Sequence, residues 1–550
     1  MSDTPIDPLW TIDATLVSRG FTLERPPLVY RGPLRVHGIE IAVEIDVPDV
    51  AFVAMPRVKI TDASGLPIKR LAHVLDEGGV CYFGQGGLPL DMYDPGGSVL
   101  RVLEEAAAAL ERSFAGGAKA EFEAELASYW RGNSLFVAIS RGGAPEIVEA
   151  ELVGLLSSPK SGIAVVPKGQ WQDAGERLGP ACVLTFASDL QHSASFPPDT
   201  LAAVIKYVAA QPKPPPRWRE VILQAASEGM PVFLSAPNAI IGWGVTLPPI
   251  LAATKARTRG FRPSFLPKAI QRAPETVTLD RKVGLEVDLR QCVERNLLGQ
   301  PSLIGKSVTL IGCGTIGGYL ARLLAQSGAG CGALFTLYDT DRLSPGNIGR
   351  HALGVMRLGQ NKALAVAEWL HTDFHPDVDA RGIDTDAVRA WSEIAKSDLV
   401  IDATGEQNVS TALNHLFMQM PYEGAPTLLH TWVFGNGVAA QSFLNLRDQG
   451  ACYRCLKTDF AGQWRVNPLR DTKAEQIHAA ARCGEAGYVP FAADAPSAAA
   501  NLALRAAIDW AGDQPGQHLR TTVLDQKAGR ERVPWASPER LPRCLACGTG

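Results

Sequence analysis

Two hydrophobic periodicities mark the first part of the chain. Residues 39–46 alternate apolar and polar side chains and residues 50–60 form a second strand-like run, so together they predict an antiparallel sheet. Residues 98–110 place apolar side chains at helical spacing, and residues 122–130 predict a shorter helix. A glycine-containing loop at residues 73–95 separates the sheet from the helices. This order of elements predicts a small α+β domain.

The middle and last parts of the chain differ in pattern. Short apolar strands separated by turns fill residues 135–279, which predicts an α/β or α+β domain without evident chemistry. After residue 297, strands and helices alternate. The predicted strands are 307–311, 334–339 and 399–403, and the predicted helices are 316–327 and 362–370. This alternation predicts an α/β domain with a parallel, doubly wound, Rossmann-like sheet.

Length and composition set the broad class of protein. The 550 residues exceed one domain, and the patterns place predicted domains at residues 1–132, 133–284 and 285–550, the middle one a linker domain of unknown role. Hydrophobic residues make up 46% and charged residues 20%, which is typical of a soluble protein with large cores. The net charge of −4 disfavours nucleic acid and anionic membranes as main partners. No apolar stretch reaches the roughly 18 residues of a membrane span, and no secretory signal is evident, so we expect a cytoplasmic protein.

A glycine-rich turn follows the predicted strand at residues 307–311. Gly312, Gly314 and Gly317 form the pattern Gly-x-Gly-x-x-Gly, in which the glycines permit a tight turn, a close phosphate and close helix packing. Asp339 lies 22 residues after Gly317, where an acid binds a ribose in such folds. A purely structural turn is the alternative, but the strand, the helix and the acid together favour a nucleotide site.

Polar residues after Asp339 distinguish between kinds of nucleotide. A dinucleotide needs little beyond backbone N–H groups, whereas a triphosphate needs cationic side chains and a divalent metal. The sequence supplies Asp341, Asn347, Arg350 and Lys362 at short intervals. Each alone is compatible with a solvated surface position, but their joint spacing favours a nucleoside triphosphate.

Four of the ten cysteines stand in two Cys-x-x-Cys pairs. Cys452 with Cys455, and Cys544 with Cys547, supply four thiolates, which is the ligand set of a tetrahedral structural zinc. A redox-active pair is the alternative, but no thioredoxin-like sequence flanks either pair. We therefore predict that these four cysteines bind Zn²⁺.

The nucleotide motif resembles that of the ubiquitin-activating-like (E1-like, ThiF-like) adenylyltransferases, which include the bacterial enzymes that activate sulfur-carrier proteins. The resemblance covers about residues 285–550. It rests on Gly312, Gly314, Gly317, Asp339, Asp341, Asn347, Arg350, Gly359 and Lys362. It implies that Asp339 binds the ribose of ATP. Asn347, Arg350 and Lys362 would hold the ATP phosphates.

The metal segment of that family has an imperfect counterpart at residues 400–405. The family carries an Asp-x-x-Asp segment whose acids help to hold Mg²⁺, but the second acid is Gly405 here. The resemblance therefore leaves Asp402, helped by Glu406, as the predicted Mg²⁺ ligand. A structural acid at a strand end is the alternative.

A further cysteine is implied by the same resemblance. Cys483 lies between the two cysteine pairs, where related enzymes carry the cysteine that accepts the activated carrier. A thiolate attacks an acyl-adenylate readily, because sulfur is strongly nucleophilic and AMP leaves well. A buried, inert thiol is the alternative. The family commonly carries the four-cysteine zinc site, and related dimers imply a homodimer in which Arg290 or Arg295 reaches the neighbouring subunit's nucleotide.

The loop before the first long helix resembles a second family. His73, Cys81 and the apolar helix that follows resemble the ubiquitin-conjugating (E2-like) enzymes over about residues 12–130. This resemblance implies that Cys81 forms a thioester. No Pro-Asn follows His73, so the asparagine that stabilises the oxyanion in that family has no counterpart. A loop cysteine without function is the alternative.

A chain with both modules resembles the activating and conjugating fusion proteins of bacterial CBASS antiphage operons. The resemblance implies ATP-dependent adenylation of a carrier's C-terminal carboxylate, the carrier being a cGAS-like nucleotidyltransferase that ends in glycine or a similar small residue. The carrier would pass to Cys483, then to Cys81, and finally to an amine of a target protein.

Three other functions compete with this one: a sulfur-carrier adenylyltransferase for cofactor synthesis, an NAD-dependent oxidoreductase and a non-catalytic scaffold. The first leaves Cys81 unexplained. The second leaves Arg350, Lys362 and the cysteine pairs unused, and the third has its best support in Gly405.

Overall fold

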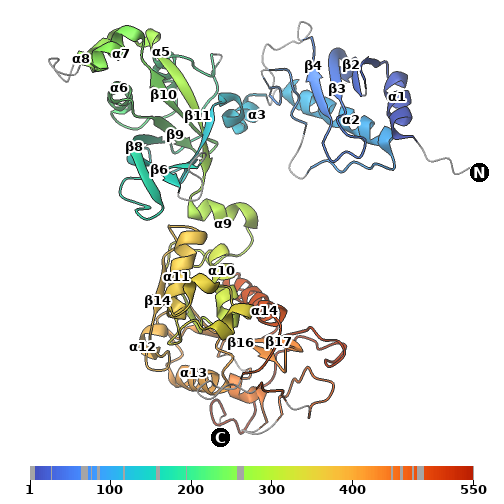
Figure 1. Ribbon diagram of the computed structural model, residues 1–550, viewed down its shortest axis with the longest axis vertical. Coiled ribbons are helices and arrows are strands. Elements are labelled where there is room, and N and C mark those ends of the chain that lie inside the picture. The colour runs from blue at the N-terminus through green and yellow to red at the C-terminus, as the bar shows by residue number, and fades with distance from the viewer. Residues whose placement is uncertain are drawn as a thin grey trace, which may run out of the picture. The chain divides into compact units, whose positions relative to one another are not determined.

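The structure is a computed structural model of the chain (Figure 1). It describes residues 7–26, 28–62, 72–75, 77–82, 87–114, 118–155, 162–193, 195–256, 265–447, 450–458, 463–473, 476–479 and 488–548. These residues form two compact units. The first lies within Met1–Gln170 and Gly175–Glu286, and the second lies within Trp171–Ala174 and Val287–Gly550.

The first unit begins with a four-stranded antiparallel sheet of order β1-β2-β3-β4. Its strands are β1 (Thr22–Arg25), β2 (Val29–Val36), β3 (Ile39–Asp46) and β4 (Arg57–Ile60). Helices α1 (Pro8–Ser18) and α2 (Pro95–Phe114) pack against it. The alternating residues Ile41, Val43 and Ile45 of β3 form one core with both helices. The predicted sheet and helix are therefore present.

The strand expected at residues 50–60 is shorter than predicted. Only β4 pairs with β3, because Asp49 folds the residues after it into a turn. The Asp49 carboxylate accepts the backbone N–H of Ala51 at 3.0 Å and that of Val53 at 2.9 Å. Phe52 has a left-handed φ of 57°, so this segment cannot extend into the sheet.

The rest of the first unit is a closed barrel of order β10-β11-β5-β7-β6-β8-β9. Its strands are β5 (Asn133–Val137), β6 (Ile147–Leu155), β7 (Ile163–Pro167), β8 (Gly175–Thr185), β9 (Val232–Ala236), β10 (Ala239–Thr246) and β11 (Thr278–Glu286). The helices packed on it are α3 (Ala118–Ala124), α4 (Leu126–Trp130), α5 (Leu201–Ala209), α6 (Trp218–Glu228), α7 (Pro249–Ala256) and α8 (Phe265–Arg272). The sequence predicted only α/β or α+β here, because barrel closure depends on pairing between β5 and β11, at opposite ends of the domain.

The second unit contains a seven-stranded sheet of order β14-β13-β12-β15-β16-β17-β18. Its strands are β12 (Val308–Ile311), β13 (Phe335–Tyr338), β14 (Ala380–Ile383), β15 (Leu399–Asp402), β16 (Thr427–Phe434), β17 (Ala439–Asn445) and β18 (Leu519–Val523). Strands β12 to β16 run parallel to one another, and β17 and β18 are antiparallel to their neighbours. The predicted doubly wound, Rossmann-like sheet is confirmed.

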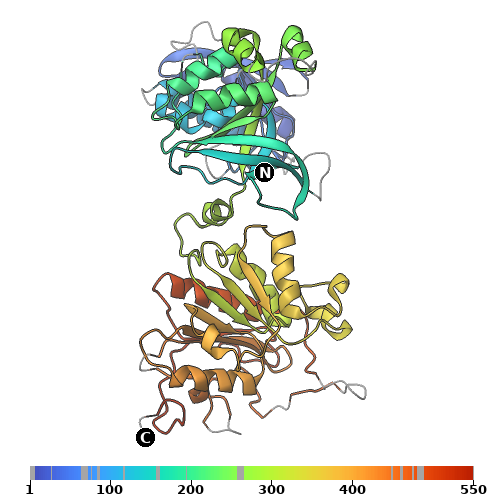
Figure 2. The ribbon, with the colours of Figure 1, turned by 90° about the vertical axis from the view of Figure 1, so that its left-hand side faces the viewer.

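Helices cover both faces of this sheet (Figure 2). The helices of the unit are α9 (Leu289–Leu297), α10 (Thr315–Gln326), α11 (Lys362–Asp373), α12 (Trp391–Ile394), α13 (Gln407–Gln419) and α14 (Asp494–Ala511). α10, α11 and α14 share a core with one face, and α12 and α13 share a core with the other. Among the described residues, no helix is long and apolar enough to cross a membrane.

Candidate active sites

The three glycines of the nucleotide motif lie between β12 and α10, and each has a distinct steric environment. A Cβ atom on Gly312, whose φ is +87°, would lie 2.9 Å from the backbone of Thr404. A Cβ atom on Gly317 would lie 1.8 Å from the carbonyl oxygen of Gly312. At Gly314, no described atom lies within 4 Å of the same position. The turn therefore packs tightly at two glycines and is open at the middle one, which suits the approach of a phosphate.

Asp339 follows β13 and contacts the glycine turn directly. Its Oδ2 accepts the backbone N–H of Cys313 at 2.7 Å, and its Oδ1 accepts that of Asp341 at 2.8 Å. Burial raises the pKa of Asp339, and these two hydrogen bonds oppose the rise. Lys362, at the start of α11, donates its Nζ to Asp341 Oδ2 at 2.9 Å. The structure thus brings the two acids, the lysine and the glycine turn into one group.

A cavity of about 1110 Å³ opens at the start of α10. At this end its lining includes Thr315, Ile316, Arg350, Thr404, Gly405 and Glu406. The lining of the same cavity also includes Trp432, Trp464, Arg470 and Lys527. Small-molecule sites usually measure about 300–1,000 Å³. The cavity therefore has room for a nucleotide together with part of a second substrate.

Arg350 is fixed in the wall of this cavity. Its Nη1 donates to the carbonyl oxygen of Val489 at 2.9 Å. Its guanidinium carbon lies 4.5 Å from the ring centre of Phe491 and 5.5 Å from that of Tyr488. Among the described residues, the buried Nε of Arg350 has no hydrogen-bond partner. An unpaired buried cationic donor is costly, so this position fits a bound anion such as a phosphate.

Two predicted residues make contacts within their own segments instead. Asn347, like Asp339, Asp341 and Lys362, is not part of the cavity lining. Its Oδ1 accepts the N–H and the Oγ–H of Ser344, each at 3.0 Å, and so caps the 3₁₀ helix Pro345–Arg350. Arg290 pairs with Glu294 on α9 at 3.1 Å. In this structure Asn347 orients the segment that carries Arg350, and the phosphate and subunit-bridging roles stay predictions.

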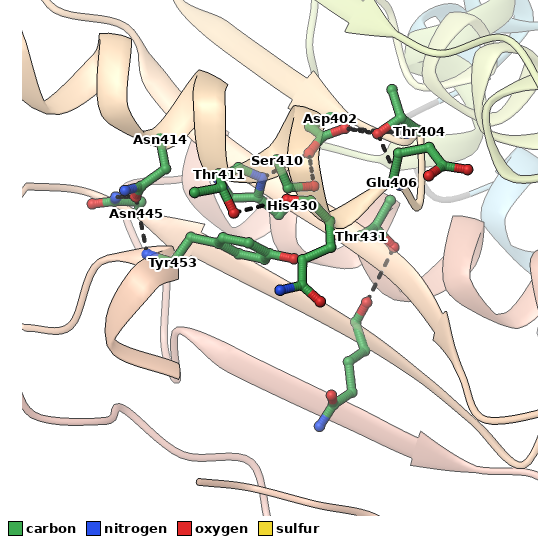
Figure 3. A network of polar contacts seen from close by, with 12 residues as sticks. Asp402, Thr404, Glu406, Ser410, Thr411, Asn414, His430, Thr431, Asn445 and Tyr453 are labelled. Atoms are coloured by element: carbon green, nitrogen blue, oxygen red, sulfur yellow. Dashed lines mark hydrogen bonds and ion pairs between the residues drawn. The ribbon is translucent and has the colours of Figure 1, made fainter. Parts of the chain in front are cut away.

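Asp402 ends β15, is buried, and has both carboxylate oxygens bonded (Figure 3). Its Oδ1 accepts the backbone N–H of Thr404 at 3.1 Å and the Thr404 hydroxyl at 2.7 Å. Its Oδ2 accepts the Ser410 hydroxyl at 2.5 Å and contacts His430 Nδ1 at 2.8 Å. Burial alone would raise the pKa of Asp402, but His430, Ser410 and Thr404 together hold it below its usual value. A carboxylate has about four acceptor positions, and these contacts occupy them. Direct binding of Mg²⁺ by Asp402 would therefore displace one of these partners.

The two cysteine pairs come together as predicted. The sulfur atoms of Cys452, Cys455, Cys544 and Cys547 all lie within 4.8 Å of one another. Individual Sγ–Sγ distances are 3.9 Å for Cys452 with Cys455, 3.8 Å for Cys452 with Cys544, and 3.3 Å for Cys455 with Cys547. A tetrahedron with Zn–S bonds of about 2.3 Å has edges of about 3.8 Å. The cluster is therefore consistent with a zinc site.

Replacing Cys455 with serine should remove the metal and destabilise the second unit. Cys452 and Cys455 belong to a hydrophobic cluster with Trp432 and Phe434, so loss of the metal would loosen that core. We expect the free energy of unfolding to fall by about 4 kcal/mol. Metal analysis of the purified protein, together with urea unfolding, measures both effects. Cys331→Ser, at a buried cysteine outside the cluster, should retain zinc. A wild-type protein that is as stable without zinc as with it would contradict the site.

Cys81, which lies in the chain between β4 and α2, is exposed. Its backbone N–H donates to the carbonyl oxygen of His73 at 2.7 Å, and Val74 pairs with Val80 in a short β-bridge. These contacts place His73 and Cys81 side by side at the base of a tight turn. An exposed thiol is what exchange with an external thioester requires. The other predicted nucleophile, Cys483, lies outside the described residues.

Family models match both ends of the chain. Residues 290–545 match the ThiF family, and residues 10–135 match prokaryotic E2 family B. The chain is therefore a fusion of an E2-like domain with a ThiF, E1-like domain, and the resemblances of its two sets of motifs are confirmed.

Several similar proteins are known. The ATP-dependent ubiquitin transferase-like protein Cap2 of Pseudomonas aeruginosa is 29% identical over 521 residues, which are 91% of this chain and 91% of that protein. Cap2 of Vibrio cholerae is 38% identical over 213 residues, covering 38% of this chain and 35% of that protein. The crystal structure of E. coli MccB with ATP covers 47% of this chain and 69% of its own at 16% identity, with a TM-score of 0.34. The chain is thus a Cap2-like fusion and an enzyme of the ATP-dependent ubiquitin transferase-like class.

Sequence reasoning missed three groups of residues. His430 and Ser410 complete the Asp402 network, but they lie on other elements and carry no motif. Trp432 and Trp464 line the cavity from segments with no nucleotide signature. Glu121 and Glu125, whose carboxylates contact the His73 ring at 3.2 Å and 2.9 Å, were also missed, although their spacing of four residues along a helical segment was a usable signal.

Proposed function

We propose that the chain activates the C-terminus of a carrier protein and transfers it to a target amine. A carboxylate oxygen of the carrier attacks the α-phosphorus of ATP, and pyrophosphate leaves. The Cys483 thiolate then attacks the acyl carbon, and AMP leaves. Cys81 takes over the acyl group by thioester exchange. Finally, an amine of the target displaces the Cys81 sulfur and forms an amide.

The observation that carries this proposal is the cavity at the glycine turn. It joins the start of α10 to Arg350, whose buried Nε lacks a partner among the described residues. Gly314 leaves open space where backbone N–H groups approach a phosphate. Both features favour a nucleotide with several negative charges. The same end carries Glu406, which lines the cavity beside the fully bonded Asp402 and is the more accessible carboxylate for Mg²⁺.

The far part of the cavity supports a protein substrate. The rings of Trp432 and Trp464 stack with centres 5.3 Å apart, and Arg470 and Lys527 line the same cavity. A peptide bound against these rings would share the cavity with Arg350. A carrier that ends in a small residue such as glycine is what the family resemblance implies.

The partners follow from the same resemblance. The carrier is a cGAS-like nucleotidyltransferase, the acceptor is an amine of another protein, and the active form is a homodimer. The similar P. aeruginosa protein is named as ubiquitin transferase-like, which agrees with transfer of a protein rather than of sulfur. A sulfur-carrier adenylyltransferase has no use for an E2-like domain at residues 10–135.

Intact-mass measurement tests the proposed function. The full chain is incubated with ATP, Mg²⁺ and a candidate carrier that ends in glycine, and the same carrier without its last residue is the control. We expect AMP release and an adduct of one carrier mass that hydroxylamine removes. Formation of neither AMP nor adduct, together with no carrier-dependent exchange of pyrophosphate into ATP, would overturn the proposal.

A further inference from the structure

The turn between β16 and β17 carries an asparagine with a glycine on each side. Gly435 and Gly437 have left-handed φ values of 61° and 83°, which permit the tight reversal of the chain. A Cβ atom on Gly437 would lie 3.0 Å from the Cβ of Phe491, so the turn packs closely against that residue. Asn436 lines the same cavity as Arg350. The turn therefore places the Asn436 side chain in the cavity wall.

The side-chain amide of Asn436 joins two other segments of the chain to this turn. Its Oδ1 accepts the backbone N–H of Ile477 at 2.8 Å, and its Nδ2 donates to the carbonyl oxygen of the same residue at 2.8 Å. The amide thus pairs with Ile477 as the backbone of a neighbouring strand would. The same Nδ2 donates to the carbonyl oxygen of Pro490 at 3.3 Å. Asn436 is therefore bonded to residues 476–479 and to residues 488–491 at once.

These two segments pair with each other but lie near the surface. The backbone N–H of Ala479 donates to the carbonyl oxygen of Tyr488 at 2.9 Å, and the two residues form an antiparallel bridge. Ile477 is 67% exposed and Tyr488 is 50% exposed. A longer contact joins Gln476 Nε2 to the carbonyl oxygen of Gly435 at 3.4 Å. Segments with so little buried apolar surface depend on hydrogen bonds for their position, and Asn436 supplies three of these.

Arg350 lies on the second of the two segments. Its Nη1 donates to the carbonyl oxygen of Val489, and its guanidinium stacks on Phe491. Val489 and Phe491 are the two chain neighbours of Pro490, which Asn436 holds. A shift of this segment would therefore shift the guanidinium of Arg350 with it.

We propose that Asn436 is a positioning residue for Arg350 and acts through the segment of residues 488–491. This assignment rests on the proposed binding of ATP phosphates by Arg350. An amide group has two N–H donors, and Ile477 and Pro490 use both of them, so Asn436 acts without donating to the nucleotide. Without Asn436, the guanidinium would have to be ordered when ATP binds, and this ordering lowers affinity.

Binding of ATP to the full chain tests this assignment. Asn436→Ala removes all three hydrogen bonds and adds no charge. We expect the ATP dissociation constant, measured by equilibrium dialysis, to rise about tenfold. Asn436→Ser keeps one hydroxyl for these contacts and should fall between Asn436→Ala and the wild type. Asn501→Ala removes an exposed asparagine of α14 that donates to the carbonyl oxygen of Ser497 at 2.9 Å, and it should bind ATP like the wild type.

A double-mutant cycle separates positioning of Arg350 from general stabilisation of the fold. If Asn436 acts through Arg350, adding Asn436→Ala to Arg350→Ala should weaken ATP binding by less than about twofold. If Asn436→Ala does not fold, Asn436→Ser takes its place in the cycle. An equal loss of affinity with and without Arg350 would overturn the assignment.

Two other results have distinct meanings. Wild-type ATP affinity in a folded Asn436→Ala protein would overturn the positioning role and leave the proposed function standing, even if this variant formed thioesters slowly. A wild-type chain that binds no ATP would overturn the proposed function, and the role of Asn436 with it.

Discussion

Arg350→Ala should lower carrier-dependent exchange of pyrophosphate into ATP by roughly 100-fold or more. Arg350 lines the cavity at the glycine turn, is held by Val489, and stacks on Phe491. It is therefore already in position before the nucleotide arrives, and its charge is not screened by an acidic partner among the described residues. Preorganised donors of this kind contribute most where charge develops during phosphoryl transfer. The exchange rate at saturating ATP and carrier measures the effect.

Two further variants make this result specific. Arg350→Lys keeps the charge but loses the planar fork and the ring stacking, so we expect intermediate activity. Arg342→Ala removes a guanidinium from the same segment that donates to the Gly359 carbonyl oxygen at 3.0 Å and lies outside the cavity lining, so it should leave exchange close to normal. Normal exchange in Arg350→Ala, with thermal stability equal to the wild type, would show that the nucleotide binds elsewhere.

The parts of this molecule that were predictable from sequence depend on short-range spacing. The glycine turn was predictable because Gly312, Gly314 and Gly317 lie within six consecutive residues, and each is needed for a different steric reason. In the structure, each of the three has different surroundings. The cysteine cluster was predictable because each Cys-x-x-Cys pair presents two sulfurs on one turn. Local patterns of this kind carry their geometry with them.

Features that depend on distant pairing were not predictable. Barrel closure requires β5 to pair with β11, and nothing in either strand specifies the other. Asp402 was predicted as a metal ligand from its match to the first acid of the family's Asp-x-x-Asp segment. His430, which comes from the next strand, accounts for one of the hydrogen bonds that occupy its carboxylate. A sequence pattern gives the residue that ends a strand, whereas the tertiary structure decides which partners use its lone pairs.

The contacts of His73 with Glu121, Glu125 and Tyr129 illustrate the same limit. The regular spacing of Glu121, Glu125 and Tyr129 can be seen in the sequence. Their common partner, His73, cannot, because the long helix α2 separates it from them in the chain. The ubiquitin-conjugating resemblance drew attention to the missing asparagine after His73. The structure shows instead that two carboxylates from the barrel side hold that histidine. Both carboxylates lie within residues 10–135, the span of the E2-like match, but their pairing with His73 across a long helix carries no sequence signal.

Cys81→Ala should abolish ligation to target amines while leaving the carrier attached to Cys483. Adenylation and the first thioester do not involve Cys81, so both should form at normal rates, and the acyl group then has no second thiol to reach. Cys483→Ala should retain pyrophosphate exchange but form neither thioester, because a carrier adenylate has no acceptor within the chain. Intact-mass spectra before and after hydroxylamine, together with peptide mapping of the adduct, distinguish these states.

Ligation by a mixture of the two variants tests whether both thiols must belong to one chain. Both thiols belong to one polypeptide, so the second transfer occurs at a high effective concentration. A mixture of Cys81→Ala with Cys483→Ala should therefore ligate much more slowly than the wild type. Cys292→Ala, a partly buried cysteine on α9, should behave like the wild type. Normal ligation by Cys81→Ala would eliminate the second thioester. A carrier found on Cys81 in the Cys483→Ala variant would show that Cys81 accepts the adenylate directly, so that the chain works with one thiol instead of two.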